Sequence, residues 1–347
     1  MMNEAAQPRP DVLALDIGGA NIKAADGAGW SASEPFAMWR EPHRLTDAVA
    51  SIVRGRMPRR LVVTMTGEIA DCFASRAAGV RHIVGSATAA ATACGCGAPG
   101  IYLTDGQIVT PAEAVTRPLA AAASNWHAVA RLAAASMTMQ RAVLIDIGST
   151  TTDIVPLVGG RPAPLAFDDA GRMLSGELVY TGVERTPLPA IVRRLPHGQI
   201  RRPIAAERFA ESRDAWLLLG GLEESVDARD TADGGPFTRE ASRIRIARTM
   251  LVEPADLSED DALKAAAWSA RAQARLIARS LQKVIRGCGW QPGQIVISGH
   301  GERLARLALD QGGWSLETVS LPTILGPDVS RSAPAHALAM IAQGMLP

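Results

Sequence analysis

Short apolar runs, each followed by glycine or small polar residues, recur along this chain. The clearest is the run at 142–145, which predicts a buried strand. It leads into DIGSTTTD at 146–153, and a second apolar run at 154–158 predicts the returning strand. Glycine and small hydroxyl residues at such a turn let backbone N–H groups approach an anionic oxygen closely. This pattern predicts a β-hairpin that binds phosphate.

A looser copy of this pattern lies near the N-terminus. The strand predicted at 12–15 leads into DIGGANIK at 16–23, and residues 21–25 form its expected partner. A third glycine turn, GHG at 299–301, follows another apolar run at 294–298. Repeated strand–turn–strand units predict a duplicated domain, with two half-sites closing on one phosphate-bearing ligand.

Periodic apolar positions separate these strands and predict helices. The predicted helices cover 46–54, 87–93, 111–115, 126–135, 207–219, 239–250, 260–286, 302–309 and 333–341, and 75–81 reads as a turn or short helix. Strands that alternate with helices indicate the α/β class. Because 347 residues exceed a typical single core, we expect an N-terminal α/β domain at 11–140 and a C-terminal one at 141–347, the latter with an insert around 160–260.

Charge and composition limit the classes of partner that we expect the protein to bind. There are 36 basic and 35 acidic residues, and aromatic residues make up 4%, so neither a basic field nor a base-stacking surface for nucleic acid is expected. No long apolar run and no signal peptide is visible. We therefore expect a cytoplasmic protein with small-molecule substrates, no nucleic-acid or membrane partner, and possible homo-oligomers.

Carboxylates at the predicted strand ends are candidate metal ligands. Asp16, Asp146 and Asp153 flank the two hairpin turns, where oxygen ligands could hold Mg²⁺. The candidate anion-binding positions are Gly18, Gly19, Asn21, Lys23, Gly148, Ser149, Thr150, Thr151, Gly299, His300 and Gly301. For Lys23, a phosphate contact and an ordinary strand lysine are both open, and His300 can equally be a plain turn residue.

Other candidates lie outside these turns. Glu68 and Asp71 follow the short strand at 61–63, at the strand end where α/β proteins gather ligand-binding groups. Each could be a general base, a metal ligand or a helix cap. Arg185 suits anion binding, and Asp233, before two glycines, can also be only a turn residue.

The three glycine turns together resemble the phosphate-1, phosphate-2 and adenosine loops of the actin, sugar kinase and Hsp70 superfamily. That resemblance implies a duplicated two-domain α/β fold with the ligand in an interdomain cleft. The superfamily includes kinases, ATPases, hydantoinase-like enzymes and filament proteins, so the fold alone does not give the function.

Four blocks together carry a narrower resemblance. They are MTGEIADCF (65–73), DIGSTTTDIVP (146–156), SGELVYTGVERTP (175–187) and DGGPFT (233–238). They resemble the hydantoinase/oxoprolinase-related family linked to tetrahydromethanopterin-dependent one-carbon transfer, which includes enzymes of methanofuran biosynthesis. The resemblance covers 12–342.

This resemblance implies a transferase reaction. An (aminomethylfuranyl)methyl diphosphate condenses with the phenol of glutamyl-tyramine, which releases diphosphate and forms an aryl ether. The alanine- and arginine-rich composition looks bacterial, so methylofuran as the product and a tyrosine-type acceptor stay open.

The implied reaction assigns roles to the candidates. The hairpin turns would hold diphosphate with Mg²⁺, and Asp146 would contribute to catalysis. Glu68 or Asp71 would take the phenol proton. Tyr180, Thr181, Arg185 and Asp233 would shape the substrate pocket. ATP is not expected as a cofactor.

Three alternatives stay open. An ATP-dependent small-molecule kinase would use the same three loops, and so would a hydantoinase-like ATPase. A non-catalytic, nucleotide-gated regulator is the third, although no DNA-binding helix-turn-helix is evident. ADP formation would distinguish the ATP-dependent enzymes from the diphosphate-releasing transferase.

Overall fold

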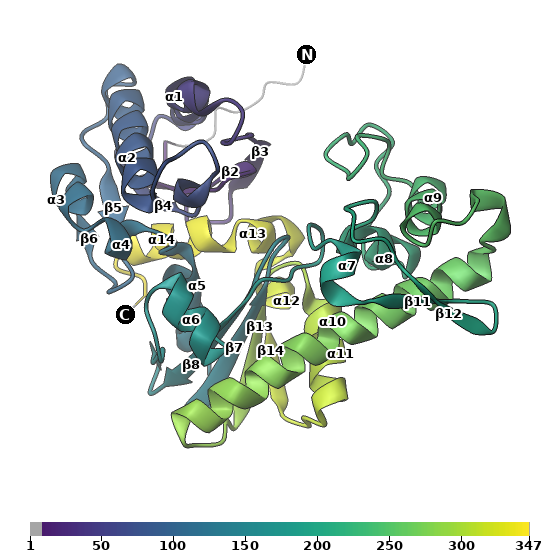
Figure 1. Cartoon of the computed structure of the whole chain (residues 1–347). Coiled ribbons are helices and arrows are strands. Elements are labelled where there is room, and N and C mark those ends of the chain that lie inside the picture. Colours follow the sequence, from purple (N-terminus) through teal and green to yellow (C-terminus); the bar gives the residue numbers. More distant parts are fainter. Residues whose placement is uncertain (1–8, 347) are drawn as a thin grey trace, which may run out of the picture.

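The first half of the chain forms a six-stranded sheet. The computed structural model describes residues 9–346, and Figure 1 shows two sheets flanked by helices, with a lobe projecting to one side. The first sheet has the order β3-β2-β1-β4-β5-β6. Its strands are β1 (Val12–Ile17), β2 (Asn21–Ala25), β3 (Ser31–Pro35), β4 (Arg60–Met65), β5 (Gly100–Tyr102) and β6 (Ile108–Val109).

The second sheet repeats this arrangement. Its order is β10-β8-β7-β13-β14, with β9 (Arg161–Pro162) paired to β8. Its strands are β7 (Arg141–Ile147), β8 (Thr152–Val158), β10 (Leu178–Val179), β13 (Gln294–Ser298) and β14 (Glu317–Ser320). In both sheets a central strand has its hairpin partner on one side and a parallel strand on the other. The duplicated α/β fold predicted from the sequence is confirmed.

Helices of the first half pack on its sheet. They are η1 (Pro42–Arg44), α1 (Leu45–Arg56), η2 (Gly67–Ile69), α2 (Arg76–Ala93), α3 (Pro111–Thr116) and α4 (Pro118–Ala121). Of the two alternatives for 75–81, a turn or a short helix, the helix is confirmed, and it continues without a break to Ala93 as α2. Gly79 weakened the helical pattern, yet a Cβ there would lie 2.2 Å from the carbonyl oxygen of Glu68. The glycine is required for the close packing of η2 on α2.

Two helices join the halves. The helix α5 (Asn125–Ala135) packs on the second sheet, whereas α14 (Ala333–Ala342), from the end of the chain, packs on β1 and β4. Both helices share one buried core with residues of both sheets. The sheets lie within the predicted ranges 11–140 and 141–347, and the domain boundaries themselves stay predictions.

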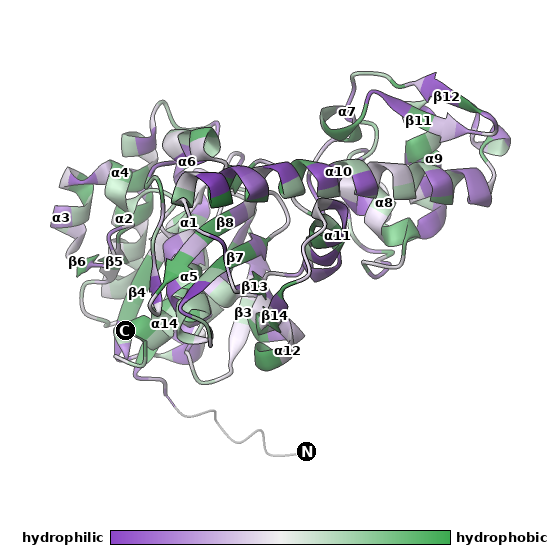
Figure 2. Cartoon of the chain, turned by 90° about the horizontal axis from the view of Figure 1, so that it is seen from below, coloured by the Kyte–Doolittle hydropathy of each residue, from purple (hydrophilic) through white to green (hydrophobic). Residues whose placement is uncertain are grey.

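The lobe lies between β10 and β13 in sequence. It contains α7 (Leu188–Ile191), β11 (Arg194–His197), β12 (Ile200–Pro203), α8 (Ser212–Leu218), α9 (Arg239–Thr249), η3 (Pro254–Asp256) and the start of α10 (Glu259–Cys288). It has its own apolar core. The 30 residues of α10 span about 45 Å and reach from the lobe to the second sheet (Figure 2).

One helix boundary in the lobe differs from the prediction. A helix was expected at 207–219, but α8 begins at Ser212 because Glu211 and Asp214 form a capping box there. The remaining helices are α6 (Asp169–Ser175), α11 (Glu302–Gly312), α12 (Leu321–Leu325) and α13 (Pro327–Arg331). Within residues 9–346, no helix combines the length and apolar character that a membrane crossing requires.

Candidate active site

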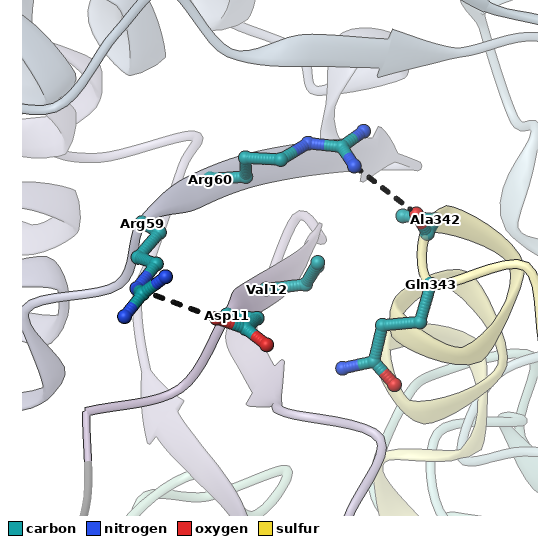
Figure 3. A pocket seen from close by; sticks show the side chains of 6 residues that line it. All are labelled: Asp11, Val12, Arg59, Arg60, Ala342 and Gln343. Carbon is teal, nitrogen blue, oxygen red and sulfur yellow. Dashed lines mark hydrogen bonds and ion pairs between the residues drawn. The ribbon is translucent and has the colours of Figure 1, made fainter.

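A surface depression lies far from the predicted site residues. It has a volume of about 350 Å³ and is lined by Asp11, Val12, Arg59, Arg60, Ala342 and Gln343 (Figure 3). It lies where β1 and β4 begin, whereas the predicted residues follow the ends of these strands. The candidate site is therefore built from the loops at the opposite edge of the sheets.

The two hairpin turns have the same hydrogen bond. Gly18 N–H donates to Asn21 O at 2.9 Å, and Gly148 N–H donates to Thr151 O at 3.0 Å. These two N–H groups are therefore not free for an anion, which corrects the prediction for Gly18 and Gly148. The N–H groups at the tips of both turns are not used in this way. In the part of the chain that the structure describes, the N–H groups of Gly19, Ser149 and Thr150 have no hydrogen-bond acceptor.

Lys23 of the first hairpin acts on a carboxylate of each hairpin. Asp16 lies opposite Lys23 in the β1–β2 pair. Burial raises the pKa of Asp16 to about 6, against the effect of Lys23. Burial also raises the pKa of Asp146, and Lys23 again acts to lower it, together with Ser298 and His300. Because one lysine acts on a carboxylate of each sheet, the two half-sites face each other.

The carboxylate of Asp153 already forms an ion pair with a side chain of the protein. Its carboxylate lies 3.0 Å from the guanidinium of Arg172, which is 1% exposed. Arg172 also stacks 3.9 Å from the ring centroid of Trp126. Burial raises the pKa of Asp153 to about 6, although Arg172 lowers it. The ion pair makes Asp153 a poor Mg²⁺ ligand, which corrects that prediction.

Asp16 and Asp146 fit a cation better. The Oδ1 atom of Asp16 is buried without a hydrogen-bond partner, as expected of a group that meets a ligand. Among residues 9–346, no three or more His, Cys, Asp or Glu side chains are grouped to hold a metal. An ion beside Asp16 and Asp146 would therefore take its other ligands from phosphate and water, as Mg²⁺ commonly does.

Glu68 and Asp71 differ in burial. Glu68 lies in η2 with 1% of its surface exposed, and neither carboxylate oxygen has a hydrogen-bond partner. Burial raises its pKa to about 7, and the nearby backbone N–H group of Glu68, the charge of Arg76 and the N–H group of Ala123 act against that rise. Asp71 is exposed. It does not cap α2 either, because Ser75 Oγ accepts from Ala78 N–H. A buried carboxyl with a pKa near neutrality suits a general base, so the structure favours Glu68.

The 180–186 segment lies directly on the second turn. The N–H groups of Glu184 and Arg185 both donate to Ser149 O, and a Cβ on Gly182 would lie 2.5 Å from Gly148 O. Thr181 is buried, and its hydroxyl contacts Thr186 Oγ1 and Gln273 Nε2. The prediction that Thr181 lines the pocket is therefore corrected, since it holds the loop in place.

Two exposed aromatic side chains lie in or beside this segment, and the half-buried Arg185 contacts one of them. Tyr180 is 58% exposed. The guanidinium of Arg185 lies 5.5 Å from the ring centroid of Trp39, which belongs to the first half and is 47% exposed. Arg185 has no carboxylate partner among residues 9–346. Sequence reasoning missed Trp39, because it follows an irregular segment without a motif.

The third glycine turn closes against the second. Gly299 has φ of +77°, and a Cβ there would lie 2.2 Å from Ile147 O. Gly301 N–H already donates to Ile147 O, so it is not free for an anion, which corrects the prediction for Gly301. His300 Nε2 lies 3.0 Å from Glu184 Oε1. These glycines are needed for close packing of the turns.

Glu184 pairs with His300 of the third turn and with Arg213 of the lobe, whereas the partners of Asp233 lie in the lobe alone. Burial would raise the pKa of Glu184, but His300 and Arg213 lower it to about 2. Asp233 lies in the lobe, where it accepts from Gly235 N–H and pairs with Arg245 at 3.1 Å. The structure thus does not bring Asp233 to the turns, and the prediction that it lines the pocket is corrected.

Comparisons with known proteins agree with this architecture. A family model described as hydantoinase/oxoprolinase matches residues 59–180. A protein of Methanocaldococcus jannaschii is 28% identical over 340 residues, which cover 96% of this chain and 98% of that protein. A protein of Methanococcus vannielii is 31% identical over 206 residues, which cover 59% of this chain and 91% of that protein.

Both relatives carry the same name, (4-{4-[2-(gamma-L-glutamylamino)ethyl]phenoxymethyl}furan-2-yl)methanamine synthase. The chain belongs to this synthase family. Among solved structures, a nucleotide-free acetone carboxylase shares the fold with a TM-score of 0.51 at 13% identity. That match covers 92% of this chain and 51% of the carboxylase chain.

Proposed function

We propose that the protein is a transferase that forms the aryl ether of a methanofuran-type cofactor. Its donor is an (aminomethylfuranyl)methyl diphosphate, and its acceptor is the phenol of glutamyl-tyramine or of a tyrosine-type compound. The observation that carries this proposal is the similarity, over nearly the whole chain, to a synthase whose name specifies a phenoxymethyl furan.

The reaction exchanges one carbon–oxygen bond for another. The bond between the furanylmethyl carbon and the diphosphate oxygen breaks, and the phenol oxygen bonds to the same carbon. The furan ring stabilises positive charge on that carbon, so the protein mainly has to stabilise the departing diphosphate and place the phenol in line. The free N–H groups of Gly19, Ser149 and Thr150, with the ammonium of Lys23, supply donors for that anion.

Glu68 is the base in this proposal. The phenol proton must leave as the ether bond forms, and a buried carboxylate with a pKa of about 7 can accept it near neutral pH. Asp71 is the weaker candidate, because its carboxylate is exposed to solvent.

Asp16 and Asp146 would hold Mg²⁺. When bound, the ion would neutralise charge on the diphosphate and make it a better leaving group. Lys23 acts on both carboxylates, so the cation and the lysine would share one anion between the two halves.

We place the acceptor side at the half-buried Arg185 and the exposed Trp39 and Tyr180. Arg185 and Trp39 approach each other from the two halves, and Tyr180 is exposed nearby in sequence. A guanidinium suits the carboxylate that both candidate acceptors carry, and an aromatic face suits their phenol ring. The substrates are small molecules, and we place the reaction in the cytoplasm.

The direct test supplies both substrates to the purified protein with Mg²⁺ and without ATP. We expect stoichiometric diphosphate and aryl ether, measured by a coupled phosphate assay and mass spectrometry. No ether without ATP, together with ADP formation and a phosphorylated acceptor when ATP is added, would instead establish a kinase.

A further inference from the structure

An ion pair joins the two halves beside Glu68. Arg76 is the first residue of α2, and Asp169 is the first residue of α6. The Nη2 atom of Arg76 lies 2.6 Å from Oδ2 of Asp169, with side-chain exposures of 28% and 19%. The helix α2 packs on the first sheet, whereas α6 follows the second hairpin, so the pair crosses from one half to the other.

Glu68 lies against the same turn of α2 as Arg76. Its carbonyl oxygen approaches Gly79 so closely that a Cβ there would lie 2.2 Å away. Arg76 and Asp169 both act on the Glu68 carboxylate, with opposite sign. A buried carboxylate near an arginine normally forms a charge-assisted pair, yet neither Glu68 oxygen pairs with a side chain, and the groups nearest to it include the backbone N–H groups of Glu68 and Ala123. The nearby arginine is instead occupied by a residue from the other half.

We propose that Asp169 is a positioning residue, which holds Arg76 across the interface and so keeps Glu68 unpaired and able to accept the phenol proton. This inference rests on the proposed function. Because the two members of the pair come from different halves, the base is free only while the halves are together.

Glu68 and Asp169 compete for the guanidinium of Arg76. The charged side chains that act on Glu68 are Arg76 and Asp169. Arg172, on the same helix as Asp169, is already held by Asp153 at 3.0 Å. When Asp169 loses its charge, the partner left for the guanidinium of Arg76 is Glu68.

Two single variants and their combination test the proposal. In Asp169→Asn, Arg76 is released and pairs with Glu68, so kcat falls by about 30-fold and the acid limb of the pH–rate profile moves to lower pH. In Arg76→Met no guanidinium competes for Glu68, so kcat stays within about threefold and the acid limb moves to higher pH. The double variant recovers at least about tenfold of the kcat lost in Asp169→Asn.

This recovery separates positioning from a merely structural bridge. Either single variant breaks a bridge, so a bridge predicts that the double variant is no more active than the worse single. Asp105→Asn, which breaks the exposed pair with Arg117 in the first half, is the matched control and should leave the pH profile unchanged. If Asp169→Asn proves unfolded by circular dichroism, Asp169→Glu must retain activity, since it preserves the ion pair.

The outcomes also separate this inference from the proposed function. Diphosphate release by the wild type, combined with no recovery in the double variant, overturns the role of Asp169 and leaves the transferase proposal intact. No diphosphate release by the wild type overturns the transferase proposal itself.

Discussion

Burial raises the pKa of Asp16 to about 6, and the carboxylate of Asp146 adds to that rise, although the two residues lie near the ends of strands in different sheets. Each aspartate is the next-to-last residue of the corresponding strand, β1 in one half and β7 in the other. The turn after each strand is closed by the same hydrogen bond, which a glycine N–H donates. Two like charges are thus kept close, with Lys23 acting on both. Such an arrangement is costly unless a cation or a proton joins it, which favours a cation–phosphate site.

Replacement of these two aspartates should remove activity without unfolding the protein. In Asp16→Asn and in Asp146→Asn we expect kcat/KM to fall by about 100-fold or more, because each variant would lose a proposed Mg²⁺ ligand. The thermal midpoint should stay the same or rise, since a buried charge is removed. Calorimetry and turnover of the same preparations check this, and unchanged turnover in both variants would refute the shared site.

If Glu68 is the base, as proposed, its ionisation gives the pH–rate profile its acid limb. Because the carboxylate must be ionised to accept a proton, and its pKa is raised to about 7, kcat/KM should rise with pH up to that region and then level off. In Glu68→Gln the limb should disappear and kcat should fall by about 100-fold. An acid limb that persists in Glu68→Gln assigns the base to another group.

The same residue makes the folded protein less stable at high pH. A carboxyl whose pKa is higher folded than unfolded binds more protons when folded, so its contribution to stability is lost as pH rises from about 4.5 to about 7. Glu68→Gln should therefore be about 1–3 kcal/mol more stable than the wild type at pH 8 and similar to it at pH 4. Urea unfolding at both pH values measures the difference, and equal stability at pH 8 contradicts the unpaired carboxylate.

Lys23 should bind the leaving group. Lys23→Met removes the ammonium that acts on both aspartates, so inhibition by added diphosphate should weaken about tenfold, which corresponds to about 1.4 kcal/mol. Lys264→Met is the matched control, because that lysine lies on the exposed start of α10. Equal inhibition constants for both variants would leave Lys23 as an ordinary strand lysine.

Trp39 and Arg185 should determine acceptor binding. In Arg185→Met and in Trp39→Ala we expect KM for the acceptor to rise about tenfold while KM for the diphosphate donor changes little, because these residues flank the turns without forming them. Initial rates with each substrate varied in turn separate the two effects. A rise confined to the donor KM would place Arg185 at the diphosphate instead.

The fold could be predicted from the sequence because each of the two hairpins has a recognisable local pattern. An apolar run, an aspartate and a glycine turn predicted β1 and β7 correctly, and the long periodic pattern predicted α10 to within two residues at each end. The helix α2 was predicted in pieces, because the requirement for Gly79 comes from a contact with Glu68 that lies in tertiary structure.

The site could be predicted only in part, for the same reason. The carboxylates at strand ends were visible as residue types, but the pairing of Asp153 with Arg172 and of Arg76 with Asp169 joins distant positions. Whether Thr181 faces a ligand or Gln273 depends on burial, which a local motif does not encode. Trp39 had no motif at all.

An isotope measurement tests the central claim most directly. The donor is synthesised with ¹⁸O at the oxygen that bridges the furanylmethyl carbon and the diphosphate, and it is incubated with the phenol acceptor, Mg²⁺ and enzyme. If the furanylmethyl group is transferred, the carbon–oxygen bond breaks, so all of the label leaves in diphosphate and the ether contains only the phenol oxygen. Label retained on a furanmethanol, with the phosphoryl group on the acceptor or on water, would show cleavage at phosphorus and contradict the account.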